Sequence, residues 1–291
     1  MTVDAAWVGL SLIEQMGAKR LRALTAHFDG DLAAILAADE HALRRVPGIG
    51  AVMAAAIRKV DVERVRANLS AWAEEGITPL VLGTVGYPPR LAAIPDAPPT
   101  LFLRGRTDWM ERRALAVIGT RTPSHVGAMA ARALGAALAA RDILVVSGMA
   151  LGIDTGAHHG ALSLRKHGDT SPERALTVAV WGGGLHQLYP RESGILAQVI
   201  ALRGALVSEG HPDAEPTAPR LVARNRIIAG LCEAVIVVES TLDGGAMHAA
   251  RRALEYGRTV YTLDLPATGN QALLGMGAQV ITPELVGLAG Q

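Results

Sequence analysis

The sequence predicts an α/β protein with an extended Rossmann-like, doubly wound and mostly parallel sheet, preceded by a small all-helical domain. Three observations support this prediction. From residue 76 onward, short β-rich runs alternate with alanine-rich helical segments, which is the pattern of repeated βαβ units. Several runs are apolar throughout, as strands are when helices cover both faces of a sheet. Residues 1–75 show helical periodicity without that alternation.

The composition is that of a globular chain with a sizeable core. Of the 291 residues, 50% are hydrophobic and 19% are charged, which excludes an intrinsically disordered protein. The single cysteine, Cys232, excludes an intramolecular disulfide and suits a reducing compartment. The N-terminus has no signal-peptide pattern, and no apolar run reaches membrane length. We therefore expect a soluble, cytoplasmic protein without a membrane contact.

The helical region, residues 1–75, contains a candidate helix-hairpin-helix of the SAM-like type. Its segment ALRRVPGIGAVMAAAI, residues 42–57, places the turn Pro47-Gly48-Ile49-Gly50 between two helical stretches. Hairpin glycines leave backbone N–H groups free to hold a DNA phosphate. The same hairpin also serves as a plain packing unit. Structural packing and a weak contact with duplex DNA are both open at this point.

The second region, residues 76–291, supplies the strands and the turns that follow them. Predicted strands cover residues 80–82, 100–103, 114–118, 143–147, 176–181, 205–208, 235–239, 259–263 and 279–282. The proline-rich segment 87–100 is expected to be a loop at the edge of the sheet. Ligands of a doubly wound sheet collect at the carboxyl ends of the strands, so the turns at those ends form the candidate site.

Small residues fill several of these turns, each directly before a predicted helix. Backbone N–H groups at a helix N-terminus favour anions. Several such turns along one edge predict several phosphates or one extended polyanion. Ser124 is also the expected N-cap of the first helix after the turn. The turn residues of interest are Gly119, Thr120, Arg121, Ser124, Ser147, Gly148, Gly183, Gly244 and Gly245.

The segment PRLVARNRIIAG, residues 219–230, adds a group of basic side chains without an acidic residue among them. Arg220 and Arg224 lie four residues apart, on one face of a helix that starts there. Asn225 can donate to a phosphate or to a base edge, and arginine suits bidentate phosphate contacts. The alternative interpretation is a solvated helix face that pairs with surface acids.

No motif assigns an enzymatic reaction. The sequence lacks H-E-x-x-H, C-x-x-C and G-x-S-x-G. The adjacent His158 and His159 point to different faces of a helix, so they do not chelate one metal together. We therefore predict no catalytic residue, no metal and no cofactor.

Acidic residues in the same turns have simpler interpretations. Asp154 and Asp243 precede or open predicted helices and are expected to cap them. Glu209 and Glu239 stand at strand ends, where a general acid or base could act. No partner spacing in the sequence assigns either glutamate that role.

The motifs, taken in order, resemble the bacterial DNA-processing protein A family, called DprA or Smf. The resemblance implies a non-enzymatic protein that binds single-stranded DNA through residues 76–291. It further implies protection of incoming DNA, help in loading the RecA recombinase during natural transformation, and a homodimer. The matching segments are AVIGTRTPSHVG (116–127), VVSGMALGIDTGAHHGAL (145–162), GGGLHQLYP (182–190), SEGHP (208–212), ARNRIIAGL (223–231), VVESTLDGGAMHAARRALEYGR (237–258) and GNQALLGMGA (269–278).

The resemblance also implies roles for individual residues. The family's phosphate-holding turn matches Gly119 and Arg121, and its R-N-R element matches residues 224–226. A small-residue turn beside the groove matches residues 244–247. The complete predicted DNA-binding set is Gly119, Thr120, Arg121, Ser124, Ser147, Gly148, Gly183, Arg220, Leu221, Arg224, Asn225, Arg226, Gly244, Gly245 and Met247.

The chain departs from the family pattern at three places. Leu221-Val222 stand where members commonly carry Phe-Pro, so an apolar contact replaces the stacking of an aromatic ring on a base. Ser193 stands where an asparagine is frequent. Many members continue into a winged-helix-like domain, whereas this sequence ends soon after the last predicted strand.

The resemblance implies a homodimer, and the candidate contacts for it are residues 245–256 and 269–289.

The rival hypothesis is a nucleotide-processing hydrolase on a related scaffold, of the nucleoside monophosphate phosphoribohydrolase type. Those enzymes carry a P-G-G-x-G-T-x-x-E element whose glutamate acts on the ribosyl bond. The corresponding stretch here, LDGGAMHAARR, places Arg251 where that glutamate would stand. The missing carboxylate favours DNA binding over hydrolysis.

Overall fold

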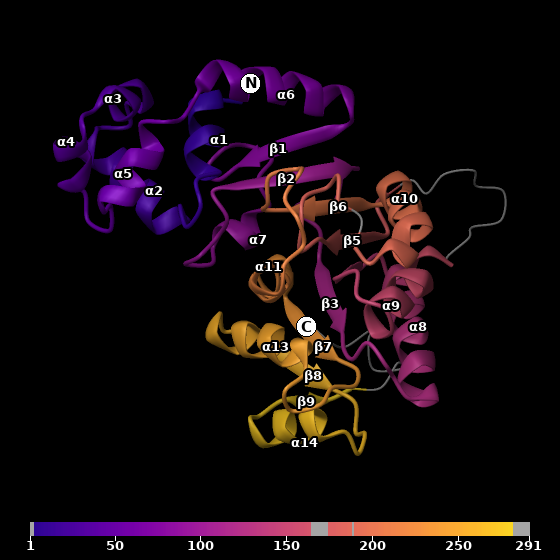
Figure 1. Ribbon diagram of the computed structural model, residues 1–291. Coiled ribbons are helices and arrows are strands. Elements are labelled where there is room, and N and C mark those ends of the chain that lie inside the picture. The colour runs from indigo at the N-terminus through magenta and orange to yellow at the C-terminus, as the bar shows by residue number, and fades with distance from the viewer. Residues whose placement is uncertain (1–2, 164–173, 188, 282–291) are drawn as a thin grey trace.

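The computed structural model describes residues 3–163, 174–187 and 189–281, and its centre is one nine-stranded sheet with helices on both faces (Figure 1). The strand order is β1-β2-β6-β5-β4-β3-β7-β8-β9. β1 and β2 pair antiparallel to their neighbours and the other strands are parallel. The predicted fold class, a mostly parallel doubly wound sheet behind a small helical region, is confirmed.

The strands lie close to their predicted positions. β3 and β6 have the predicted bounds, whereas β1 begins three residues earlier and β7 ends before Val238. Residue 282, the predicted end of the last strand, lies outside the described residues. The strands are β1 (Ile77–Val81), β2 (Thr100–Gly105), β3 (Ala114–Ile118), β4 (Leu144–Ser147), β5 (Thr177–Val180), β6 (Ala205–Ser208), β7 (Ala234–Val237), β8 (Thr259–Thr262) and β9 (Gln279–Val280).

The chain reverses its direction of travel across the sheet between β3 and β7. From β3 it adds β4, β5 and β6 on one side, and it then returns to place β7, β8 and β9 on the other. The crevice outside the carboxyl ends of the strands at such a reversal is the usual ligand site of this architecture. The fold therefore brings the turns after β3, β4 and β5 to one edge.

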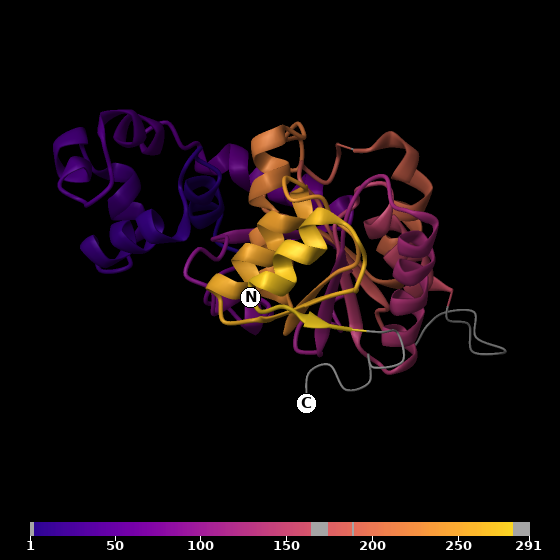
Figure 2. The ribbon, with the colours of Figure 1, turned by 90° about the horizontal axis from the view of Figure 1, so that it is seen from below.

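Two helix layers cover the sheet, as Figure 2 shows from below. The first layer holds α8 (His125–Ala140), α9 (Ile153–Leu162) and α10 (Gly194–Arg203). The second holds α12 (Asn225–Leu231), α13 (Gly245–Glu255) and α14 (Thr268–Gly275). Along β3, Leu115 and Val117 face the first layer while Ala116 and Ile118 face the second. Because side chains alternate between faces, a strand covered on both sides is apolar throughout.

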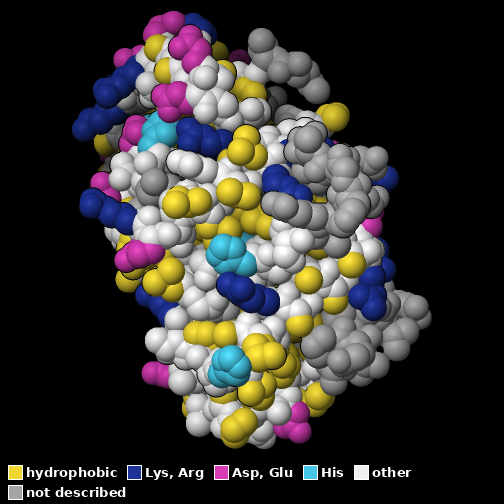
Figure 3. All heavy atoms as spheres, turned by 90° about the vertical axis from the view of Figure 1, so that its right-hand side faces the viewer, with side chains coloured by type: hydrophobic (Ala, Val, Ile, Leu, Met, Phe, Trp, Pro, Cys, Tyr) yellow, Lys and Arg dark blue, Asp and Glu magenta, His cyan; other side chains and the backbone are white. Residues whose placement is uncertain are grey.

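The outer surface of the first helix layer carries no broad band of positive charge among the described residues (Figure 3). Hydrophobic side chains are scattered over it with a few separate basic residues and histidines. Its exposed apolar residues include Val126 and Met129 of α8 and Ile195 and Leu202 of α10. The described part of this face therefore does not resemble an extended track for a polyanion.

The helical region holds two groups of helices with different neighbours. α2 (Ala18–His27), α3 (Leu32–Ala37), α4 (Glu40–Arg44) and α5 (Ala51–Ile57) surround one core, to which Leu10 of α1 (Ala5–Ser11) also belongs. α1, through Val8, and α6 (Val62–Glu74) share a second hydrophobic cluster with the sheet. The rings of Trp72 and Phe102 meet edge to face, with centroids 5.3 Å apart. The edge of the sheet and the first helices are therefore parts of one packed core.

The connection between β1 and β3 contains more structure than the sequence indicates. The proline-rich segment, expected to be a loop, includes the helical turn α7 (Pro89–Ala92). A proline at the first helical position lacks only an N–H that would have no partner there. Leu91 of this turn is fully buried beneath α12. The expectation of a plain loop was wrong for these four residues.

Candidate nucleic-acid interface

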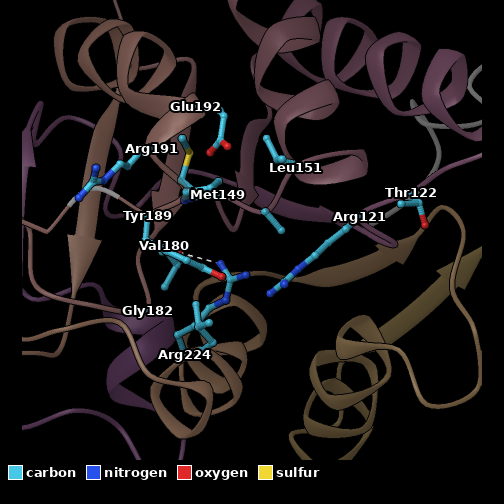
Figure 4. A pocket seen from close by; sticks show the side chains of 13 residues that line it. Arg121, Thr122, Met149, Leu151, Val180, Gly182, Tyr189, Arg191, Glu192 and Arg224 are labelled. Carbon is cyan, nitrogen blue, oxygen red and sulfur yellow. Dashed lines mark hydrogen bonds between the residues drawn. The ribbon is translucent and has the colours of Figure 1, made fainter.

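A pocket of about 540 Å³ opens at the carboxyl edge of the sheet, between the turns after β3, β4 and β5 (Figure 4). The short helix α11 (Ala218–Ala223) and the segment 189–192 complete its walls. Much of the lining is apolar, and arginines stand at opposite sides. The lining residues are Arg121, Thr122, Met149, Ala150, Leu151, Val180, Gly182, Tyr189, Pro190, Arg191, Glu192, Leu221 and Arg224.

Arg224, at the junction of α11 and α12, presents a buried guanidinium to the pocket wall. Its Nη1 donates to the carbonyl oxygen of Val180 at 2.8 Å, and its Nη2 lies 3.6 Å from a carboxylate oxygen of Asp154. The buried Nε has no hydrogen-bond partner among the described residues. Burial lowers the pKa of Arg224, and the Asp154 charge opposes that shift. The guanidinium therefore keeps donor capacity for an anion that enters the pocket.

Gly148 leaves the space that this guanidinium occupies. A Cβ at residue 148 would overlap the Arg224 side chain. Gly119 is similarly enclosed, because a Cβ there would lie 2.6 Å from Ile153 Cγ1 and 2.7 Å from the Glu239 carbonyl oxygen. Glycine stands at both positions because the turns pack closely, and not because they form an open anion site of backbone N–H groups.

Arg121 is the exposed counterpart of Arg224. In Figure 4 the two side chains extend toward one another from opposite sides of the pocket. Within the described part of the chain, no hydrogen bond or ion pair engages the Arg121 guanidinium. Its turn is fixed by backbone, since Thr120 N donates to the Glu239 carbonyl oxygen at 2.7 Å. Arg121 therefore has a rigid base and a free charged end.

Ser124 caps α8, as predicted. Its hydroxyl accepts from Gly127 N at 3.1 Å and donates to a carboxylate oxygen of Glu239 at 2.9 Å. Ser124 N donates to the same carboxylate oxygen. Glu239 thus holds the start of α8 and does not reach into the pocket.

The other members of the R-N-R element face away from the pocket. Arg226 Nη2 donates to Glu209 at 2.5 Å, and Arg226 Nε lies 3.7 Å from Asp96. Asn225 is buried and donates to the carbonyl oxygen of Gly245 at 3.3 Å. Arg220 is exposed and donates to the carbonyl oxygen of Glu215. Of the basic residues in this segment, Arg224 is the one that lines the pocket.

The remaining predicted residues are spread over the same edge, and most of them do not line the pocket. Ser147 is buried and donates to the Val117 carbonyl oxygen at 2.6 Å. Gly183 is buried, and Gly182 beside it lines the pocket instead. Gly244 and Gly245 open α13, whereas Met247 is buried in the core beneath that helix. Leu221, which replaces the aromatic of the family pattern, does line the pocket.

The predicted set contains only Arg121, Leu221 and Arg224 of the lining residues, and the residues that sequence reasoning missed include Met149, Leu151, Tyr189, Arg191 and Glu192. Tyr189 is the exposed aromatic at the mouth, and 40% of its surface is accessible. The motif GGGLHQLYP contains it, but the prediction named only Gly183 of that motif. A tyrosine after a glycine-rich turn at the strand ends was the available signal.

Neither Asp154 nor Asp243 caps a helix, so both predictions were wrong. The N-cap of α9 is Gly152 and that of α13 is Gly244, and neither helix has a side-chain cap. Asp154 lies inside the first turn of α9 and is buried. Burial raises the pKa of Asp154, while Arg224 and hydrogen bonds from the backbone amides of Ala150 and Gly119 act in the opposite direction.

The two adjacent histidines point apart, as predicted. His158 is fully buried, with Nε2 2.7 Å from the carbonyl oxygen of Gly148 and Nδ1 2.7 Å from the Thr177 hydroxyl. His159 is exposed. Because a carbonyl only accepts, Nε2 of His158 carries the proton in this hydrogen bond. His158 therefore fixes the carbonyl of the glycine that contacts Arg224.

Neither a metal site nor a membrane-spanning helix occurs in the described part of the chain. No group of three or more histidine, cysteine, aspartate or glutamate side chains among residues 3–163, 174–187 and 189–281 is arranged to hold a metal ion. Among those same residues, every helix is too short or too polar to cross a membrane.

The family assignment rests on comparison with known proteins. The model of the family described as DNA recombination-mediator protein A matches residues 79–285. The chain belongs to this family. The Smf protein of Synechocystis is 33% identical over 97% of this chain and 71% of its own length. The Smf protein of Escherichia coli is 38% identical over 67% of this chain, which spans 52% of that relative.

Solved structures of family members share the fold. DNA processing protein A of Streptococcus pneumoniae superposes with a TM-score of 0.79 at 27% identity, covering 100% of this chain and 99% of that one. The Helicobacter pylori member, described for its single-stranded DNA binding mode, has a TM-score of 0.65 at 27% identity. That comparison covers 73% of this chain and 94% of the other.

Proposed function

We propose that this protein binds single-stranded DNA at the pocket between Arg121 and Arg224 and acts in DNA processing during natural transformation. The observation that carries the proposal is the pair of arginines with unused donors on opposite sides of a largely apolar pocket. Phosphates suit the guanidinium groups, and an unstacked base suits the apolar wall. The single-stranded DNA binding described for the Helicobacter pylori relative supports the same conclusion.

The shape of the site favours a single strand over a duplex. The pocket lies in a crevice among turns, and none of its described walls is a projecting helix that could enter a major groove. A base paired inside a duplex cannot reach the walls formed by Leu151, Tyr189 and Leu221. Contacts to phosphates and to base faces carry little sequence information. We therefore expect binding with little sequence preference.

Protection of incoming DNA, assistance to RecA and a homodimeric state complete the proposal. They come from the family resemblance, and residues 245–256 and 269–289 are the proposed dimer contacts. Residues 282–289 of the second segment lie outside the described part of the chain. Light scattering is expected to give the mass of a dimer, and a monomer at high protein concentration would contradict it. We also propose a weak contact between the Pro47-Gly48-Ile49-Gly50 hairpin and duplex DNA.

The described residues favour binding over the nucleotide-hydrolase alternative. Arg251, at the place of that family's glutamate, is exposed on α13. Glu209 pairs with Arg226, and Glu239 holds the start of α8. Neither of these two carboxylates lines the pocket, and Glu192 is the acidic residue among the described residues that line it.

The test is fluorescence anisotropy with a labelled single-stranded oligonucleotide and its duplex at several salt concentrations. We expect preference for the single strand and an affinity that falls steeply as salt rises, because phosphate contacts release counterions. Equal affinity for the duplex, or an affinity independent of salt, would contradict the proposal. Release of free base from a nucleoside monophosphate would instead support the hydrolase.

A further inference from the structure

The buried carboxylate of Asp154 joins three segments that form the candidate DNA site. It belongs to the first turn of α9, and the backbone amides of Gly119, after β3, and Ala150, after β4, together with the Ser147 hydroxyl, act to lower its pKa against the effect of burial. Its ion-pair partner is the Arg224 guanidinium at the start of α12. The fold therefore brings two strand-end turns and the central arginine to one negative charge.

Asp154 is almost entirely enclosed, which gives its charge a large influence on local geometry. The exposed fractions of the Asp154 and Arg224 side chains are 5% and 10%. A buried charge without a partner is strongly unfavourable, so each group restricts where the other can lie. Gly148 borders the guanidinium on one side, and the Val180 carbonyl accepts from it on another.

We propose that Asp154 is a positioning residue of the DNA site, which holds the Arg224 guanidinium at the pocket wall. The inference rests on the proposed binding of single-stranded DNA. Asp154 itself does not line the pocket, so it acts on DNA through Arg224. No catalytic role is implied.

A simple sum of charges makes the opposite prediction. Asp154 is negative and lies beside a site for phosphates, so removal of its charge should strengthen DNA binding by Coulomb's law. A positioning role requires weaker binding, because an arginine without its counter-charge leaves the wall or loses its fixed direction. The sign of the change therefore separates the two accounts.

The experiment compares Asp154→Asn with Asp96→Asn in the full-length chain. Asp154→Asn keeps the shape of the side chain and an acceptor oxygen, but it carries no charge to hold Arg224. Asp96 serves as the control, because its carboxylate also faces an arginine of this segment. The distance from Asp96 Oδ2 to Arg226 Nε is 3.7 Å, and Asp96 lies outside the pocket. Single-stranded DNA affinity is measured for both variants, for Arg224→Ala and for the Asp154→Asn/Arg224→Ala double variant, with thermal melting of each.

We expect Asp154→Asn to weaken binding about tenfold and to have little further effect once Arg224 is absent, because residues that act through one contact are not additive. Asp96→Asn should bind like the parent or slightly more tightly. Parent-like or tighter binding by Asp154→Asn, or a full additional loss in the double variant, would overturn the inference. A parent protein that fails to bind single-stranded DNA would refute the proposed function instead.

Asp154→Glu covers the case in which Asp154→Asn does not fold. It keeps the charge but moves the carboxylate by one methylene group. Positioning predicts weaker binding for this variant, whereas a sum of charges predicts no change. Parent affinity in a folded Asp154→Glu protein would reject the positioning role.

Discussion

Arg224 keeps a permanent positive charge in surroundings that exclude most water. Its guanidinium loses hydration, and the Val180 carbonyl and the Asp154 carboxylate compensate for part of that loss. The unpartnered Nε leaves the compensation incomplete. A phosphate bound in the pocket would give the Arg224 guanidinium a further acceptor and a counter-charge, which is the physical reason for expecting this residue to contribute to binding.

Removal of Arg121 or of Arg224 should weaken single-stranded DNA binding. Arg121→Ala and Arg224→Ala are each expected to cost roughly 1.5–3 kcal/mol, the range for hydrogen bonds to charged groups. Each should also reduce the salt slope by about one unit. Anisotropy titrations at several salt concentrations measure both quantities. Arg141→Ala, an exposed arginine at the far end of α8, is the control, and an equal loss there would contradict a localised site.

Acid should destabilise the protein through His158. Burial lowers the pKa of His158 from its ordinary 6.5 to about 4, with smaller contributions in the same direction from His159 and Arg224 and an opposing one from the Gly148 hydrogen bond. The unfolded chain therefore takes up a proton at a higher pH than the folded protein. The resulting stability is complete above pH 6.5 and disappears as the pH falls from 6.5 to about 4.

The full effect at His158 corresponds to about 3 kcal/mol. Urea unfolding across this pH interval measures it, and His158→Gln should show a shallower loss of stability in acid. An identical pH dependence in the variant would exclude His158 as the source.

Sequence reasoning found Arg121 and Arg224 of the three arginines that line the pocket, but it missed Arg191 and could not separate Arg224 from Arg226. Residues 224 and 226 have the same side chain and nearly the same neighbours in sequence. Arg224 pairs with Asp154 and Arg226 pairs with Glu209. Both acidic partners lie far from the arginines in sequence and become neighbours only in the folded chain. The same limit applies to Asp154, whose place near a helix start indicates a cap while its burial beside Arg224 gives it another role.

At the scale of elements, the apolar runs made most strands predictable. β3 and β6 are buried along their whole length, so hydrophobicity marks both their ends. β1, at the edge, is partly exposed and contains Pro79, and its start carries no comparable signal. The helical turn α7 was missed because prolines usually indicate loops, whereas here one opens the helix.

Loss of the cap on α8 should destabilise the turn that carries Arg121. Ser124→Ala removes the hydroxyl that accepts from Gly127 N and leaves a Glu239 oxygen with one donor fewer. We expect a loss of about 1 kcal/mol in the free energy of unfolding, together with weaker DNA binding. Chemical denaturation and anisotropy measure the two effects. Unchanged stability would show that Glu239 and water compensate for the lost hydroxyl.

At the scale of the whole molecule, the helical region and the sheet are joined by a common hydrophobic cluster. Val8 and Trp72 from the helices contact this cluster, as do Phe102 and Leu206 from the strands. Sequence analysis placed a domain boundary at residue 75, where the pattern of elements changes. A change of pattern marks where secondary structure switches, and it carries no information on which side chains share a core.

Trp72→Ala should therefore weaken the sheet as well as the helices. Truncation of a buried tryptophan typically costs about 3–5 kcal/mol, and we expect urea unfolding followed by circular dichroism and by fluorescence to shift together. Val52→Ala, at an exposed position of α5, should have almost no effect. Unfolding of the helical region alone, with the sheet transition unmoved, would contradict the coupling.

The order of strands in the sheet also bears on how the chain folds as it leaves the ribosome. β2 is made early, yet Phe102 pairs with Ser208 of β6, and that strand emerges only after β3, β4 and β5 with α8, α9 and α10. Until then one edge of β2 lacks its partner, and Trp72 lacks part of its cluster. Pairing between segments far apart in sequence is slow, and unpaired edges invite aggregation. The N-terminal helices and β2 therefore complete their packing only after β6 has been synthesised and has paired with β2.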